Sequence, residues 1–161
     1  MEKPLWAPWR IEYILGEKSD ECFICKSLKE DRDRENLILK RGEHCLIIMN
    51  RYPYNNGHLM VATNRHIDCV EKMTVEEQLE WMSLTSLAVG ILKEKMQPQG
   101  LNIGVNLGQV AGAGLKDHIH QHIVPRWSGD TNFMPVISDT RVVAQALAEL
   151  YDQLEPLFIS R

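Results

Sequence analysis

The chain has 161 residues, of which 44% are hydrophobic and 25% charged, and its net charge is −4. This length suits one domain with a substantial core. The acidic balance argues against a protein whose main role is to coat nucleic acid, because such proteins are usually basic. No apolar run approaches the roughly 18 residues of a membrane span, and the first residues lack the pattern of a secretory signal. We therefore expect a cytoplasmic protein with no membrane partner.

Residues 1–21 form an aromatic arm interrupted by prolines. Large aromatic side chains bury much area when they dock, so Trp6 and Trp9 are expected to pack on the body of the protein or on a partner subunit. Cys22 and Cys25 follow this arm with two residues between them. In a chain without a secretory signal, this spacing indicates a metal or redox pair more than a disulfide.

Short apolar segments bounded by turn residues predict an antiparallel β-sheet of about five strands. The expected strands are residues 36–40, 45–49, 58–63, 101–105 and 119–124. Gly42 marks the first turn and residues 53–57, which contain proline, asparagines and glycine, mark the second.

Two helices are expected. Thr74 and Glu77 match a capping box, and apolar residues at helical spacing extend this helix to about Met96, before Pro98 and Gly100. A second apolar stripe, from Val143 to Leu154, predicts a helix within the C-terminal segment 139–161 that stops near Pro156. No repeat or linker divides residues 1–161, so the chain is predicted to be one α+β domain with two main helices.

Three histidines, His118, His120 and His122, alternate along the last predicted strand. Alternate residues of a strand share one face, so these imidazoles would begin roughly 6–7 Å apart on one side of the sheet. Such a row fits a metal site, an exposed polar face, or a catalytic group with its supports. A glycine-rich run at 104–114 precedes it, and backbone amides of glycines can approach an anion closely.

The segment His118-Ile119-His120-Gln121-His122-Ile123-Val124 resembles the signature of the histidine triad (HIT) family. The resemblance continues upstream at residues 50–58 and downstream at 125–133, and spans about 22–154. Residues 6–10 and 127–133 are most similar to the bacterial diadenosine tetraphosphate phosphorylase branch. The resemblance implies the HIT fold, a homodimer or larger homo-oligomer formed by helix and strand pairing, and a substrate that is an adenosine nucleotide or dinucleoside polyphosphate.

Site roles follow from the same resemblance. His120 would attack an α-phosphate and form a nucleotidyl-histidine intermediate, with His122 holding the phosphate and His118 completing the catalytic set. An imidazole suits this role because its ordinary pKa lies near 6.5, provided that a backbone carbonyl holds the other ring nitrogen as a donor. The expected nucleotide contacts are Asn50 at the ribose and, along the phosphates, Asn106, Gly108, Gln109, Gly112 and Gly114.

Two residues depart from the family pattern. Gln121 stands where an apolar residue is usual, which predicts a partly polar or interface-facing opposite side of the strand. Gly114 stands where many relatives carry a serine or glutamine that assists the leaving group, so Gln109 or Lys116 would substitute. Basic residues could also form a positive pocket despite the net charge; the candidates are Arg51, Arg65, Lys116 and Arg126.

The resemblance also suggests a structural zinc site. Its ligands would be Cys22, Cys25, His66 and His118, similar to the metal-binding branch of the family, with no open coordination position. The alternative is that two reduced cysteines simply pack in the core. His58, after Gly57, is expected to be a structural hydrogen-bonding residue. Two other functions stay open: a nucleoside phosphoramidate hydrolase, and a zinc-stabilised nucleotide-binding interaction module with little turnover.

Overall fold

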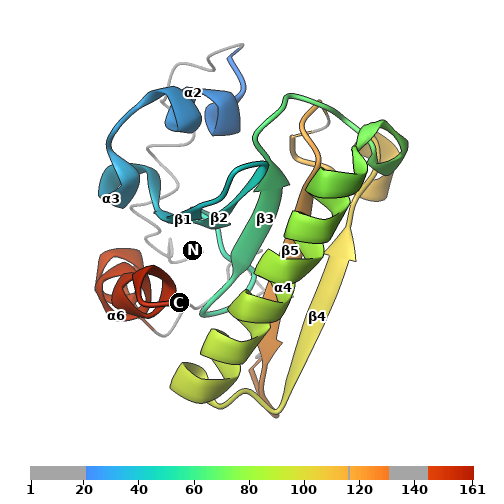
Figure 1. The fold of residues 1–161 in the computed structure, drawn as a ribbon. Coiled ribbons are helices and arrows are strands. Elements are labelled where there is room, and N and C mark those ends of the chain that lie inside the picture. Colours follow the sequence, from blue (N-terminus) through green and yellow to red (C-terminus); the bar gives the residue numbers. More distant parts are fainter. Residues whose placement is uncertain (1–20, 116, 131–144) are drawn as a thin grey trace, which may run out of the picture.

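A computed structural model describes residues 21–115, 117–130 and 145–161. One antiparallel sheet contains the strands β1 (Ile38–Arg41), β2 (Cys45–Met49), β3 (Leu59–Thr63), β4 (Gly100–Val105) and β5 (His120–Arg126). Their order is β1-β2-β3-β5-β4, so β5 lies between β3 and β4 (Figure 1). The predicted α+β class with a five-stranded antiparallel sheet is confirmed.

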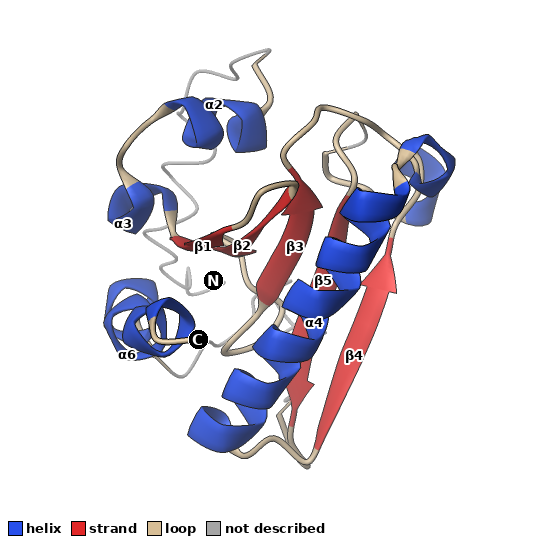
Figure 2. Cartoon of the chain, in the orientation of Figure 1, coloured by secondary structure: helices blue, strands red, loops and turns tan. Residues whose placement is uncertain are grey.

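The two long helices of the described parts are α4 (Val75–Met96) and α6 (Leu147–Ile159). Helix α4 runs across one face of the sheet, and α6 packs beside β1 (Figure 2). The short elements are the helices α2 (Phe23–Lys29) and α3 (Asp33–Asn36) and the 3₁₀ turns η1 (Val70–Lys72) and η2 (Gln109–Ala111). No helix within the described ranges is long and apolar enough to span a membrane. The predictions for Trp6, Trp9, Lys116 and Val143 concern residues outside those ranges.

Helix α4 begins and ends where its sequence predicts. The Thr74 hydroxyl accepts the backbone N–H of Glu77, and the Glu77 carboxylate accepts the N–H of Thr74, which is the reciprocal pattern of a capping box. The helix ends at Met96, and Gln97 closes it in the left-handed conformation with φ 48°. Pro98 follows and cannot continue the helical hydrogen bonds.

Both faces of the central strands are buried, and they face different neighbours. On one face, side chains such as Ile47, Val61 and Ile123 pack against α4 and α6. On the other face, Ile48, Met60 and Ala62 pack with Ile24 of α2. In the β3–β5 register, Ala62 is opposite His120 and Met60 is opposite His122, so both histidines belong to this second face.

Gln121 therefore lies on the α4 face. It is buried, and its side-chain oxygen lies 2.6 Å from the Thr85 hydroxyl of α4. The expectation that this face of β5 is partly polar is confirmed, and the partner comes from the same chain.

Three predicted boundaries were wrong. The last strand continues to Arg126, two residues beyond the predicted end at Val124. The first strand begins at Ile38, because Asn36 ends α3 and Leu37 closes that helix in the left-handed conformation with φ 63°. Helix α6 does not stop near Pro156 but continues to Ile159. Its last turn is held by the buried side chain of Phe158 and by Lys40, whose Nζ donates to the Phe158 carbonyl at 3.0 Å. Tertiary contacts thus outweigh the one backbone hydrogen bond that proline removes.

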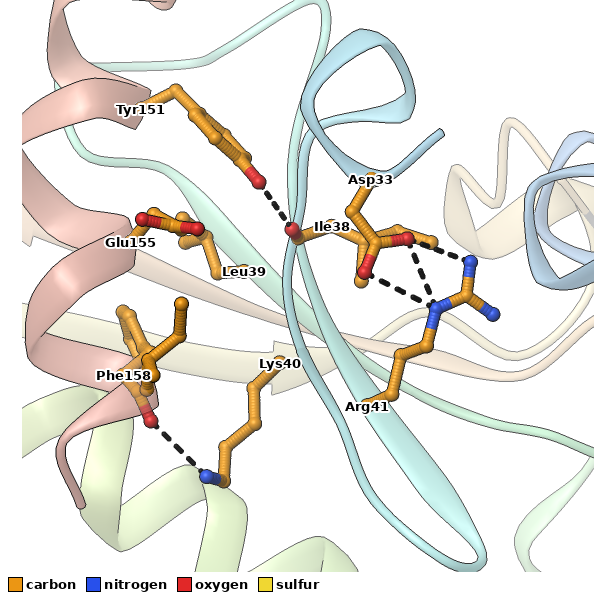
Figure 3. Close-up of a pocket in the computed structure, with 9 residues that line it drawn as sticks. Asp33, Ile38, Leu39, Lys40, Arg41, Tyr151, Glu155 and Phe158 are labelled. Atoms are coloured by element: carbon orange, nitrogen blue, oxygen red, sulfur yellow. Dashed lines mark hydrogen bonds and ion pairs between the residues drawn. The ribbon is translucent and has the colours of Figure 1, made fainter. Parts of the chain in front are cut away.

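A hollow of about 230 Å³ lies between α6 and β1 (Figure 3). Several polar groups in its wall already have partners within the chain. The Tyr151 hydroxyl donates to the Ile38 carbonyl at 2.9 Å, and Arg41 pairs with Asp33 at 2.7 Å. Since these hydrogen bonds join α6 and α3 to β1, the hollow is part of the structural frame.

Candidate active site and metal site

The nucleophile candidate His120 is oriented by a backbone carbonyl. The side chain is only 6% exposed, and its Nδ1 lies 2.8 Å from the carbonyl oxygen of His118. A carbonyl only accepts, so Nδ1 carries the hydrogen and Nε2 of the neutral ring presents its lone pair. An imidazole held in this tautomer is suited to attack an electrophilic phosphorus.

His122 is oriented by a chain of hydrogen bonds that reaches through His58. The backbone N–H of Tyr54 donates to His58 Nδ1 at 3.0 Å, so a neutral His58 carries its hydrogen on Nε2. That nitrogen lies 2.9 Å from His122 Nδ1, which must therefore accept, leaving the hydrogen of His122 on Nε2. His122 is thus prepared to donate from Nε2 to an anion.

Burial, with a smaller contribution from the nearby His120 ring, lowers the pKa of His122 to about 4. The ring therefore stays neutral at physiological pH, and the assigned tautomer is the one present. The His120 and His122 rings stand edge to face with centroids 5.0 Å apart. An unprotonated imidazole nitrogen and a donor N–H are consequently neighbours on one face of the sheet.

His58 contacts the histidine triad, a role that its place in the sequence did not predict. It was expected to make structural hydrogen bonds, and it does make them, but one partner is His122 of the triad. His58 is 1% exposed. In the sequence, His58 precedes Met60 by two residues, so the two side chains share one face of the strand. This spacing places His58 near the triad only once Met60 is known to pair with His122.

Removing His58 should impair catalysis without removing the nucleophile. Replacement by alanine is expected to lower kcat by about 10- to 100-fold, because the phosphate donor loses its orientation. Glutamine, whose amide can still donate to His122 Nδ1, should recover part of the rate. Steady-state kinetics will measure kcat and KM separately, and ¹⁵N NMR will report the His122 tautomer. An unchanged kcat in the alanine variant would contradict the assignment, and His44→Ala outside the triad serves as the control.

The loop between β4 and β5 contains the predicted phosphate contacts. Gly108 and Gly112 have φ values of 81° and 90°, which residues with side chains rarely adopt. The Asn106 amide faces Gly112, where a Cβ would lie 3.7 Å from Nδ2. The residues Gly108, Gln109, Gly112 and Gly114 are exposed. Within the loop, the N–H of Gly112 donates to the Gln109 carbonyl at 3.0 Å and that of Ala113 to the Gly108 carbonyl at 3.3 Å. Phosphate binding by this loop would therefore use its other amides.

Asn50 lies at the end of β2 on the side of the site. Its Oδ1 accepts the backbone N–H of Tyr52 at 2.8 Å, and its Nδ2 lies 3.6 Å from the sulfur of Met60. Met60 is the residue paired with His122. The predicted ribose contact is therefore a neighbour of the triad, and its side chain is held in place by a turn.

The expected positive pocket is not supported by the described arginines. Arg65 forms an ion pair with Glu77 at 2.6 Å, and Arg126 pairs with Asp130 at 2.7 Å. Arg51 donates to the Glu35 carbonyl at 2.7 Å. These cations are engaged in structural contacts, so the histidines and the loop amides are the better candidates for binding phosphate.

The four predicted metal ligands lie together. One ligand atom from each of Cys22, Cys25, His66 and His118 lies within 4.8 Å of the others. Cys22 Sγ and His66 Nδ1 are each 3.2 Å from His118 Nδ1. Tetrahedral zinc with bonds of about 2.0–2.3 Å places its ligand atoms roughly 3.3–3.8 Å apart, so the residues fit this ion.

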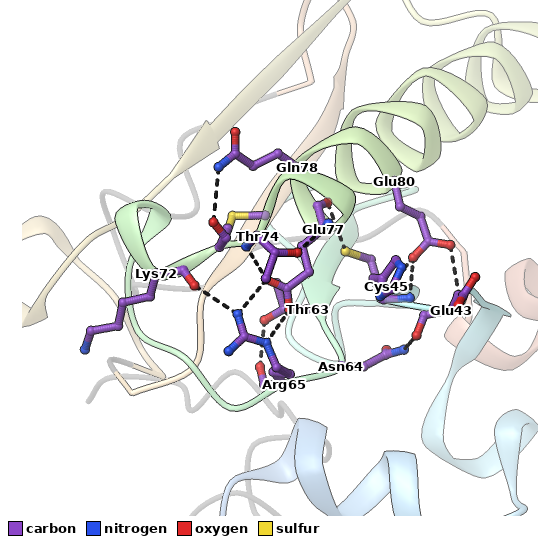
Figure 4. A network of polar contacts seen from close by, with 12 residues as sticks. Glu43, Cys45, Thr63, Asn64, Arg65, Lys72, Thr74, Glu77, Gln78 and Glu80 are labelled. Atoms are coloured by element: carbon purple, nitrogen blue, oxygen red, sulfur yellow. Dashed lines mark hydrogen bonds and ion pairs between the residues drawn. The ribbon is translucent and has the colours of Figure 1, made fainter.

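The surroundings of the metal site also fit. His118 Nε2 donates to the Thr63 carbonyl at 2.7 Å, which leaves Nδ1 as the ligating nitrogen. Next to His66, Arg65 forms two hydrogen bonds with Glu77 in the first turn of α4 (Figure 4). The loop that supplies His66 is thereby anchored to the helix.

Comparison with known proteins identifies the family. The family model described as HIT domain matches residues 32–129. The chain belongs to the HIT family. A relative named AP-4-A phosphorylase from Mycobacterium tuberculosis is 35% identical over 153 residues, covering 90% of this chain and 78% of the relative. Family membership and this relative support nucleotide hydrolase or transferase chemistry for the HIT domain.

Solved structures share the fold. A Zn-bound histidine triad family protein from Mycobacterium smegmatis has a TM-score of 0.68 and 23% identity, covering 87% of this chain and 94% of that protein. The Plasmodium falciparum diadenosine triphosphate hydrolase has a TM-score of 0.60 and 16% identity, covering 85% and 92%. At these identities the likeness shows the HIT fold, which confirms the predicted fold family.

Proposed function

We propose that this HIT domain cleaves the phosphoanhydride of dinucleoside polyphosphates, such as diadenosine tetraphosphate, through a nucleotidyl group carried on His120. The observation that carries the proposal is the hydrogen bond from His120 Nδ1 to the His118 carbonyl, because it presents Nε2 as the unprotonated nitrogen. The 35% identity to a protein named AP-4-A phosphorylase supports the substrate class.

In the first step, His120 Nε2 forms a bond to the α-phosphorus while the bond from phosphorus to the bridging oxygen breaks. The leaving nucleotide departs with that electron pair. The ring gains positive charge, which the bond from Nδ1–H to the His118 carbonyl stabilises. Nε2–H of His122 and amides of the 108–114 loop other than those of Gly112 and Ala113, which donate within the loop, bind the oxygens over which negative charge spreads.

In the second step, an oxygen of water or of inorganic phosphate attacks the same phosphorus. The P–N bond breaks and its electron pair returns to His120 Nε2. Water yields a nucleoside monophosphate, and phosphate yields a nucleoside diphosphate. Turnover with labelled inorganic phosphate distinguishes the two, since only a phosphorylase transfers the label to a nucleoside diphosphate.

Zinc is proposed as a structural ion held by Cys22, Cys25, His66 and His118. The set is complete with four ligands, so the ion would supply a cross-link between the α2 region and the loop after β3. A cytoplasmic location is part of the same proposal, because thiols stay reduced there and can ligate metal.

A second copy of the chain is the proposed partner. Strand β4 pairs only with β5 among the described strands, and no other described strand covers its outer edge, where a strand of a second copy could pair. The exposed side of α4 contains Val75, Leu79 and Met82, which are 65%, 66% and 59% exposed and recur at helical spacing. Gly90 continues this side, and a Cβ there would meet nothing within 4 Å, so the fold of one chain does not require a glycine. The absence of a side chain at Gly90 would allow a helix of a second copy to approach closely.

Charges on this helix face should separate the copies. Leu79→Glu with Met82→Glu is expected to convert a particle of two chains into a monomer of 18.5 kDa, because unpaired carboxylates would be buried at the interface. Sedimentation equilibrium will measure the mass. Ile159→Glu places the same charge on an exposed residue of α6 and should leave the dimer intact. A wild-type chain that stays monomeric at micromolar concentration would contradict the proposal.

A further inference from the structure

His118 belongs to two sites through different atoms. Its Nδ1 lies 3.2 Å from Cys22 Sγ, 3.5 Å from Cys25 Sγ and 3.2 Å from His66 Nδ1. Its carbonyl oxygen accepts the hydrogen of His120 Nδ1 at 2.8 Å. One fully buried residue thus supplies a metal ligand and the group that orients the proposed nucleophile.

We propose that metal binding at Cys22, Cys25, His66 and His118 and nucleotide binding at His120 are coupled through His118, so that each raises the protein's affinity for the other. The inference rests on the proposed function, in that it places the nucleotide phosphate at His120. It assigns His118 as a positioning residue that acts on the phosphate through His120.

The backbone around His118 is tied to the loop after β3. Ile119 N–H donates to the Ile67 carbonyl at 2.6 Å, and His118 Nε2 donates to the Thr63 carbonyl at 2.7 Å. The same loop is fixed to α4, because Arg65 donates to both Glu77 oxygens and to the Lys72 carbonyl (Figure 4). Hydrogen bonds that do not involve the ligating atoms therefore hold the side of the metal site that supplies His66 and His118.

The other side of the metal site depends on α2. Cys22 lies just before this seven-residue helix and Cys25 within it, and Ile24 and Ser27 are its buried residues. The ligand atoms of Cys22 and Cys25 lie 3.2–3.5 Å from those of His66 and His118, so an ion held among them would join α2 to the rest of the site. Coordinate bonds to that ion would restrict the imidazole of His118 and with it the carbonyl that sets the His120 ring.

The coupling has a measurable size. Coupling between two sites typically changes affinity about 5- to 150-fold, and thermodynamic linkage requires the same factor in both directions. Because a single hydrogen bond connects the metal ligand to His120, we expect a factor of roughly ten. Zinc should strengthen the binding of adenosine monophosphate by this factor, and adenosine monophosphate should strengthen the binding of zinc equally.

Calorimetry on the full chain tests the inference. The Kd of adenosine monophosphate is measured with zinc-loaded and with chelator-treated protein, and the Kd of zinc is measured by competition with and without the nucleotide. Cys22→Ser should bind adenosine monophosphate as the metal-free wild type does and should not respond to zinc. Cys69→Ser removes a thiol outside the ligand set, so zinc should strengthen its binding of adenosine monophosphate as much as in the wild type.

His120→Ala separates coupling from general stabilisation. This variant retains all four ligands but lacks the ring that donates to the His118 carbonyl. Zinc should therefore change its Kd for adenosine monophosphate by a factor of only about one. If the metal-free protein unfolds, refolding by zinc strengthens nucleotide binding equally in wild type and in His120→Ala. The difference between the two proteins in the zinc-dependent fold-change of Kd still measures the coupling.

Three outcomes would overturn the coupling: no stoichiometric zinc, a wild-type factor below about two with both ligands bound, or equal factors in wild type and His120→Ala. Failure of the proposed function looks different. In that case no covalent nucleotide forms on His120 with a dinucleoside polyphosphate, while zinc and adenosine monophosphate still strengthen each other's binding.

Discussion

His120→Ala is expected to lower kcat for a dinucleoside polyphosphate by at least about 10⁴-fold, because no other group replaces a nucleophile that forms a covalent bond. The affinity for adenosine monophosphate should fall by roughly ten-fold, the share that the oriented His120 ring contributes, and no further, since the phosphate keeps His122 and the 108–114 loop. The variant removes a buried ring from the face opposite α4, so circular dichroism should confirm that the fold is intact.

The intermediate itself can be detected. A P–N bond to imidazole survives alkali, so wild-type protein quenched in base during turnover should carry one nucleotide on the peptide that contains His120. Mass spectrometry of the digest will locate it. His44→Ala, at a histidine in the turn before β2, should keep both the rate and the adduct. A His120→Ala protein that retains wild-type kcat would remove the basis of the proposed mechanism.

Removal of zinc is expected to have the second largest effect, and it acts on stability. Zinc at about 1,000 times its Kd stabilises the folded state by about 4 kcal/mol. For a domain of this size each kcal/mol shifts Tm by about 2–4 °C, so chelation should lower Tm by about 10 °C. The reason is that the ion would join α2 to the loop after β3 through its four ligands.

Elemental analysis and calorimetry together check this prediction. Protein purified without chelator should contain one zinc per chain, Cys22→Ser should contain none, and Cys69→Ser should match the wild type. Chelator should leave the Tm of Cys22→Ser unchanged, since that variant has no ion to lose. Less than about a tenth of an equivalent of zinc in folded wild-type protein would reject the site.

Several features of this protein were readable from local sequence. The alternation of His118, His120 and His122 predicted one strand face, and the capping box at Thr74 predicted where α4 begins. The spacing of Cys22 and Cys25 indicated half of a metal site, and the resemblance to the HIT family added His66 and His118, which the structure brings together with them. Strand periodicity, helix capping and ligand spacing are short-range properties of the chain, so they are visible without the fold.

Other features depended on strand register and on packing between distant segments. His58 and His122 are 64 residues apart, and they meet only because β3 and β5 pair as neighbours in a particular register. Arg65 and Arg126, which appeared available for phosphate, are taken up by Glu77 and Asp130. The sequence by itself determined the family, the nucleophile candidate and the ligand set. The tertiary structure alone decided how His122 is oriented and which charges are already paired, because those properties depend on long-range contacts that no local pattern encodes.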